Sequence, residues 1–256
     1  MTSTKDFAPI LSDYAFFEQS ATEAPRDAAV YARQIAPLVA AGKTIRLLDF
    51  GCGTGSFTER LLGLLELEPE RLLLSLVEPV SSSHEQAAER LTSFTTAPIE
   101  HAKAIAGINQ PQFDVVIANH VFYYVPELAS TMQELERRRA PGGLFLMAIA
   151  GNANPLIQFW RDGFALLGEP SPYYVAEDVA AALTKLEIGF HQQQVPYELM
   201  FDDTEVNRLK TLRFLFADHF IRLPREPLLA LFGPYSRAGR IEIRTNCEHF
   251  TVPAAT

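Results

Sequence analysis

Cysteine is scarce in this chain of 256 residues, which contains Cys52 and Cys247 and no other. Two cysteines make neither a disulfide framework nor a cysteine-based zinc site. The sequence therefore predicts no structural disulfide, and we expect no bound metal.

Positive charge is also in deficit. The 22 lysines and arginines face 31 aspartates and glutamates, which gives a net charge of −9. Broad binding to nucleic acid or to an anionic membrane depends on a basic surface. The charge therefore favours a small-molecule substrate over a nucleic acid or a membrane.

Long apolar runs are missing as well. No run reaches the ~20 residues that a membrane-spanning helix needs. The N-terminal residues Met1–Phe7 lack the basic region and apolar core of a signal peptide. The sequence thus predicts a cytoplasmic protein without a membrane span.

Alternating strand and helix patterns fill residues 44–150. Leu72–Leu74 and Val115–Ile117 are apolar on both faces, as strands of a buried parallel sheet are. Alternation of this kind predicts an α/β fold with a doubly wound sheet, which binds ligands outside the carboxyl ends of its strands. The expected strands are 44–50, 72–78, 99–102, 113–119 and 143–150, and the expected helices are 54–65, 82–93 and 126–139.

The regions on either side of this core are mostly helical. A helix over residues 25–41 is predicted by apolar residues at helical spacing, and a period of two predicts a strand over 240–252. We expect a single domain over residues 1–256, with an N-terminal helical segment (1–43), a cofactor-binding core (44–150) and a substrate-side part (151–256). The other expected elements are helices at 154–167, 177–186, 204–216 and 226–232, and a strand at 189–197.

A glycine-rich loop follows the first strand of the core. After Asp49 at the end of the strand, Gly51, Gly53 and Gly55 alternate with other residues. A dinucleotide fingerprint would place its third glycine at position 56 or 58, where serine and threonine stand. A plain strand–turn–helix joint also contains glycines, but does not account for three alternate ones after an acid. The loop resembles the first motif of class I S-adenosylmethionine-dependent methyltransferases.

Two further segments resemble motifs of the same family. Leu76–Pro79 resembles the second motif, in which Glu78 would accept the ribose hydroxyls, although a strand-end acid can also simply face solvent. Phe113–His120 resembles the fourth motif, with Asn119 beside the cofactor. The third strand departs from the pattern because residues 101–106 contain no acid, so no residue is assigned to adenine.

The resemblance implies a Rossmann-like fold with a seven-stranded, mostly parallel sheet, helices on both faces and an N-terminal helical lid. It also implies S-adenosylmethionine as cofactor. Methyl transfer needs alignment and exclusion of water more than a catalytic triad, so the lack of a triad is consistent with it.

Patches along nearly the whole chain are similar to the histamine N-methyltransferase branch. They are Phe16–Glu23, Val77–Pro79 with Glu85–Gln86, His120–Val125 and the strand 240–252. This closer resemblance implies a small-molecule N-methyltransferase.

By position, the branch implies roles for several residues. Glu23 and His120 would be catalytic and substrate-facing, with His120 standing where the branch has an amide. Gln86 and Asn119 would face the cofactor, and Asn246 or its neighbour Thr245 would approach the substrate. Tyr124 would suit a pocket for a cationic or aromatic substrate. Purely structural roles also stay open. Glu23 could stabilise a helix N-terminus, and His120 and Tyr124 could be core residues.

Other functions are compatible with the same residues. A small-molecule O- or carboxyl-methyltransferase and a catalytically silent S-adenosylmethionine-binding module are the alternatives. A nucleic-acid amino-methyltransferase is disfavoured because Asn119–Phe122 lacks the prolines typical of that class. The sequence makes no prediction of the acceptor molecule or of the oligomeric state.

Overall fold

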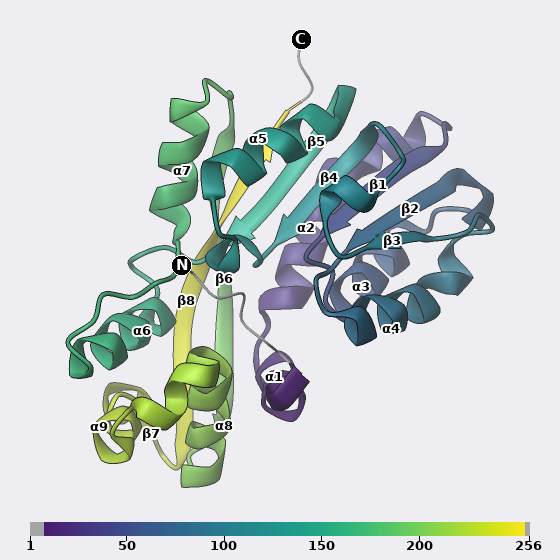
Figure 1. Cartoon of the computed structure of the whole chain (residues 1–256). Helices are drawn as coiled ribbons and strands as arrows, with labels where there is room; N and C mark the ends of the chain where they lie inside the picture. Colours follow the sequence, from purple (N-terminus) through teal and green to yellow (C-terminus); the bar gives the residue numbers. More distant parts are fainter. Residues whose placement is uncertain (1–7, 254–256) are drawn as a thin grey trace.

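The computed structural model describes residues 8–253, whose centre is one twisted sheet (Figure 1). Its strands follow the order β3-β2-β1-β4-β5-β8-β6, and the short β7 pairs with β8. Strands β1 to β5 pair in parallel, whereas β8 is antiparallel to both of its neighbours, β5 and β6. The expected seven-stranded, mostly parallel sheet is confirmed, with β7 as an addition. The strands are β1 Ile45–Phe50, β2 Leu72–Val77, β3 Glu100–Ala102, β4 Phe113–Asn119, β5 Arg139–Ile149, β6 His191–Asp202, β7 Ser236–Arg237 and β8 Arg240–Val252.

Helices cover both faces of the sheet (Figure 1). Helices α2, α3 and α4 pack on one face, against Leu47 and Ile117, and α5 and α7 pack on the other, against Leu48 and Val116. Both faces are therefore buried, which explains the continuous apolar runs of the central strands. The helices are α1 Leu11–Ser20, α2 Glu23–Ala40, α3 Ser56–Leu65, α4 Ser81–Leu91, α5 Leu128–Arg138, α6 Pro155–Leu166, α7 Ala176–Lys185, α8 Glu205–Phe216 and α9 Arg225–Ala230. Across residues 8–253, none of the helices combines the length and apolarity needed to cross a membrane.

Two strands extend at least four residues beyond their predicted ranges, and the other boundaries agree within two residues. Strand β5 begins at Arg139, four residues early, because Arg139 pairs with Phe113 before a register shift in the β4–β5 ladder. Strand β6 continues to Asp202 because it pairs with β8 along its whole length. Both extensions depend on a partner strand distant in sequence, so local patterns did not reveal them.

The N-terminal helices α1 and α2 pack against β6, which pairs along its whole length with β8. Helix α1, which was not predicted individually, packs beside α8, where the rings of Phe17 and Phe214 stack with centroids 4.4 Å apart (Figure 1). Asp13 of α1 accepts two hydrogen bonds of 2.8 Å from Arg213 of α8. The turn into α2 is held by the N–H of Thr22, which donates to the β6 backbone. Residues 1–7 of the predicted lid lie outside the described residues, and the lid function stays a prediction.

Candidate active site

A cavity opens at the carboxyl ends of β1, β2 and β4, and residues of α1 and α2 form part of its wall. Its walls combine the glycine loop, strand-end acids and a group of aromatic side chains. Among the described residues, no lysine or arginine lines it. The residues that line it include Tyr14, Phe17, Glu18, Glu23, Asp49, Gly51, Cys52, Gly53, Glu78, Asn119, His120, Tyr123, Tyr124, Trp160, Tyr197 and Phe214.

The glycine loop requires glycine for its backbone shape and for close packing. Gly51, Gly53 and Gly55 all have positive φ, at 81°, 53° and 80°. A Cβ on Gly51 would lie 2.3 Å from a methyl group of Val121, so that position excludes any side chain. A Cβ on Gly53 would meet no atom within 4 Å, so the backbone there has free space beside it. Gly55 stands at the N-cap of α3, behind the cavity wall.

Two carboxylates flank this loop. Asp49 is 2% exposed and accepts a short hydrogen bond from the Thr58 hydroxyl. Burial raises the pKa of Asp49 to about 7, with a further contribution from the charge of Glu78 and an opposing one from the Thr58 hydrogen bond. The two oxygens of Glu78 accept from the N–H groups of Gly53, at 3.2 Å, and Val80, at 3.0 Å. Burial also raises the pKa of Glu78.

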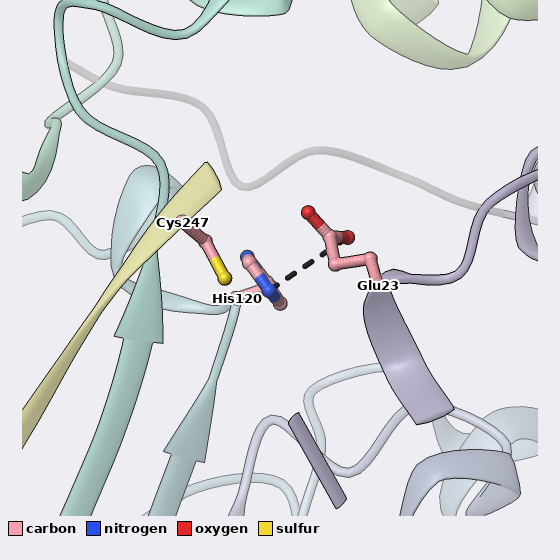
Figure 2. A group of neighbouring side chains, drawn as sticks. All are labelled: Glu23, His120 and Cys247. Carbon is pink, nitrogen blue, oxygen red and sulfur yellow. Dashed lines mark ion pairs between the residues drawn. The ribbon is translucent and has the colours of Figure 1, made fainter. Parts of the chain in front are cut away.

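His120 directly follows β4 and has a positive φ of 53°, an uncommon value for a residue with a side chain. Its imidazole Nε2 lies 3.7 Å from Glu23 Oε2 (Figure 2). The same atom lies 3.0 Å from Asp27 Oδ2, and Nδ1 lies 3.2 Å from the Tyr123 hydroxyl. Burial lowers the pKa of His120, but the charge of Glu23 and the contact with Asp27 outweigh it and bring the pKa to about 9. The strained backbone therefore aims the ring at two acids of α2.

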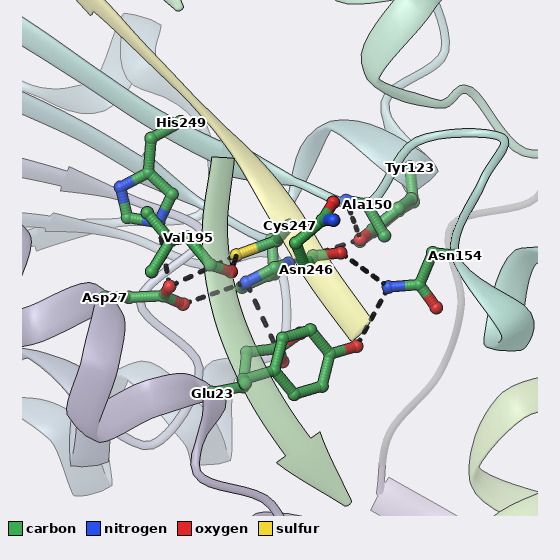
Figure 3. A network of polar contacts seen from close by, with 11 residues as sticks. Glu23, Asp27, Tyr123, Ala150, Asn154, Val195, Asn246, Cys247 and His249 are labelled. Carbon is green, nitrogen blue, oxygen red and sulfur yellow. Dashed lines mark hydrogen bonds and ion pairs between the residues drawn. The ribbon is translucent and has the colours of Figure 1, made fainter. Parts of the chain in front are cut away.

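Asp27 is the centre of a buried polar network (Figure 3). Its side chain is fully buried. The Oδ1 atom lies 2.7 Å from His249 Nε2 and accepts a 3.3 Å hydrogen bond from the Cys247 thiol. Burial raises the pKa of this carboxyl, but hydrogen bonds with His120 and His249 outweigh the penalty and hold the pKa below its usual range. Three segments of the chain thus meet at one carboxylate.

Comparison with known proteins decides the family of this site. Residues 23–187, well over half of the chain, match the family model described as a methyltransferase domain. The chain belongs to the methyltransferase-domain family. This chain is 31% identical over 179 residues to trans-aconitate 2-methyltransferase of Methylobacterium nodulans, covering 69% of its own length and 63% of the relative. It is 30% identical to the enzyme of the same name from Rhodopseudomonas palustris, covering 56% and 59%. The match thus spans about three-fifths of these relatives' length.

Solved structures agree with the fold of the chain. A Bacillus halodurans protein, described provisionally as a methyltransferase, superimposes with a TM-score of 0.56 at 13% identity, covering 88% of this chain and 99% of that one. The YcgJ protein of Bacillus subtilis gives 0.54 at 10% identity, covering 87% and 99%. At such identities the similarity concerns the fold alone.

S-adenosylmethionine is the cofactor of this family, and the residues at the glycine-loop end of the cavity fit it. The Oδ1 atom of Asn119 is buried at the cavity wall and has no hydrogen-bond partner within residues 8–253. It is free to accept from a ligand donor. The carboxylates of Asp49 and Glu78 suit the hydroxyl and ammonium groups of such a cofactor, and the open space at Gly53 admits it to the backbone.

The structure brings most of the predicted site residues to one cavity, although their roles stay predictions. Glu23, Asp49, Gly51, Gly53, Glu78, Asn119, His120 and Tyr124 line it. Gly55 does not line it, and neither does Gln86, which is exposed on α4. Asn246 does not line it either, and its backbone carbonyl accepts from the Asn154 side chain at 2.9 Å (Figure 3).

Three buried residues of the network were missed in the sequence. Cys247 and His249 lie on the same buried face of β8 as Ile241. A thiol and an imidazole on an otherwise apolar strand face could have indicated a polar network in the sequence. Asp27 lies on the apolar face of α2, four residues before Tyr31. Burying an acid on such a face costs much free energy unless it has partners, so Asp27 could have indicated a buried polar network.

Proposed function

We propose that this protein transfers the methyl group of S-adenosylmethionine to the nitrogen of a small amine or imidazole with an apolar or aromatic body. The observation that carries the proposal is the lining of the cavity beyond the glycine loop. Acids and aromatic rings occur there, and no lysine or arginine does among the described residues. Such a wall attracts a cation or a neutral amine and repels a molecule with several negative charges.

Glu23 is the acid best placed to hold the acceptor. Its side chain is 15% exposed, and it lies at the first turn of α2, where it lines the cavity beside His120. Its charge is therefore only partly screened by water, and an amine N–H that it accepts is held in one orientation. The rings of Tyr123, Tyr124 and Trp160 pack against one another next to it and suit the apolar body of the acceptor.

The chemistry requires little else from the protein. The sulfonium cofactor supplies an activated methyl carbon. The cavity walls align the acceptor nitrogen and exclude water, which is the main contribution of a protein to such a displacement. The resemblance to the histamine N-methyltransferase branch agrees with a nitrogen acceptor, but none of the relatives reported above carries a histamine-specific name.

A carboxyl-methyltransferase is the second candidate, because the relatives reported above are named for trans-aconitate. Within the described lining, the cationic group available to a carboxylate is the imidazole of His120. One histidine surrounded by acids favours a monocarboxylate over a molecule with several carboxylates.

Labelled methyl transfer distinguishes the two candidates. We would incubate the protein with methyl-labelled S-adenosylmethionine and a panel of amines, imidazoles, phenols and carboxylic acids, and locate the label by mass spectrometry. Label on nitrogen supports the proposal, and label on carboxylate oxygen alone overturns it in favour of the second candidate.

A pair of variants then tests the role of Glu23. Glu23→Gln should lower kcat/KM for the amine by roughly 10- to 100-fold, because a hydrogen bond to a charged group contributes ~1.5–3 kcal/mol. The matched control Glu89→Gln changes an exposed acid of α4 outside the cavity and should leave kcat/KM unaltered. Equal kcat/KM for the amine in Glu23→Gln and the parent protein would show that the acceptor does not contact Glu23.

A further inference from the structure

A compact set of metal-binding side chains lies next to the cavity, in the contact between α2, β8 and the end of β4 (Figure 3). Asp27 and Cys247 are fully buried and His249 is 1% exposed. One potential ligand atom from each of these three lies within 4.8 Å of the other two. His120 lies beside this group, with its Nε2 3.0 Å from the second oxygen of Asp27.

A second group of three overlaps the first. Ligand atoms of Glu23, His120 and Cys247 also lie within 4.8 Å of one another (Figure 2). Cys247 is common to both groups, so its sulfur lies within 4.8 Å of a ring nitrogen of each histidine. An ion placed there would be reached from α2, from β8 and from the end of β4.

The distances are close to those of a tetrahedral site. Ligands ~2.0–2.3 Å from zinc stand ~3.3–3.8 Å apart at tetrahedral angles. The Cys247 sulfur lies 3.3 Å from Asp27 Oδ1, and His120 Nε2 lies 3.0 Å from Oδ2. Both imidazoles lie closer to Asp27 than that range, so His120 would move outward by about 0.3 Å and His249 Nε2, at 2.7 Å from Oδ1, by about 0.6 Å.

The chemical types of these side chains select among metals. A thiol and two imidazoles favour zinc and neighbouring transition metals, whereas magnesium and calcium prefer oxygen ligands. A divalent ion with one carboxylate, one thiolate and two neutral imidazoles has no net charge. A neutral assembly is the form in which charged groups are least costly to bury.

We propose that Asp27, Cys247, His249 and His120 bind one divalent transition-metal ion of the zinc class. On binding, the Cys247 thiol and the His120 ring each release a proton to solvent. The ring proton of His249 moves from Nε2 to Nδ1, which has no partner among the described residues, and the carboxylate of Asp27 exchanges its hydrogen bonds for a metal–oxygen bond. The ion joins α2, β4 and β8 behind the cavity. Counting cysteines did not predict this site, because three of its four ligands are other residue types.

Cobalt(II) is the probe that tests the proposal most directly. Dialysed protein titrated with cobalt(II) should develop the near-ultraviolet charge-transfer band of a thiolate–cobalt bond and saturate at one ion per chain. Zinc should displace the cobalt and abolish the band. Absence of the band in the parent protein at cobalt concentrations well above that of the protein would overturn the proposal.

The other cysteine of the chain provides a matched control. Cys247→Ser should lose the charge-transfer band, and Cys52→Ser, in the glycine loop, should keep it. The reverse result would place the metal elsewhere and refute the assignment. His249→Gln should weaken cobalt binding at least tenfold while circular dichroism reports an intact fold.

A measurement on the parent protein covers the case in which the variants do not fold. X-ray absorption of the zinc-loaded protein should show one sulfur at ~2.3 Å together with imidazole scatterers. A zinc shell with oxygen ligands alone would contradict the proposal. This test is independent of the methyl acceptor, so the metal site and the proposed function can fail separately.

Discussion

The buried carboxyl of Asp49 makes the stability of the protein depend on pH in a specific way. Its pKa is about 7 in the folded chain against an ordinary value of 3.8. The folded state therefore holds this proton more tightly than the unfolded state does. The stabilisation is complete below pH ~4 and is lost as pH rises through 7. A difference of about three pKa units corresponds to about 4 kcal/mol at 1.36 kcal/mol per unit.

Asp49→Asn isolates this contribution. The amide has the shape of the protonated acid and can still accept the hydrogen bond from Thr58. We expect the free energy of unfolding of the variant to exceed that of the parent protein by an amount that grows by roughly 2–3 kcal/mol between pH 5 and pH 8. Burial of the ionised acid is the physical cause.

Urea unfolding followed by circular dichroism at several pH values measures this difference. Asp162→Asn, which changes an exposed aspartate of α6, is the matched control and should give a difference that does not vary with pH. A difference between Asp49→Asn and the parent protein that stays constant from pH 5 to pH 8 would refute the reasoning. The same variant should bind S-adenosylmethionine more weakly, because the cofactor carries positive charge that an ionised Asp49 would attract.

Three further predictions concern the glycine loop, the carboxylate of Glu78 beside it, and helix α1. Gly51→Ala should lower the free energy of unfolding by about 3 kcal/mol or more, because it adds a clash to a positive φ, whereas Gly53→Ala, where the space is open, should cost about 1 kcal/mol. Equal losses in chemical denaturation would contradict this reading of the loop. Glu78→Gln should weaken S-adenosylhomocysteine binding by roughly 10- to 100-fold in calorimetry, the value of a charged hydrogen bond, and an unchanged Kd would place the ribose elsewhere. Arg213→Met leaves the buried Asp13 without its ion-pair partner, so α1 should detach more often and be cleaved faster in limited proteolysis, with equal cleavage rates as the contrary result.

Local chemistry in the sequence was sufficient for the fold and for the glycine loop that lines one end of the cavity. The apolar runs of β2 and β4 record burial on both sheet faces, and the alternate glycines after Asp49 record a backbone that needs positive φ at Gly51. Each of these patterns is a property of a few consecutive residues. They could therefore be interpreted without knowing what lies opposite them.

The tertiary structure alone decided what meets at the other end of the cavity. Asp27 contacts His120 and His249, which lie 93 and 222 positions further along the chain. The tertiary structure also placed Gln86 and Asn246 outside the cavity lining. Pairings of this kind depend on how α2 crosses β8 and on the turn of the backbone after β4. Local sequence constrains neither, because the energy of a buried charge depends on partners that only folding brings together.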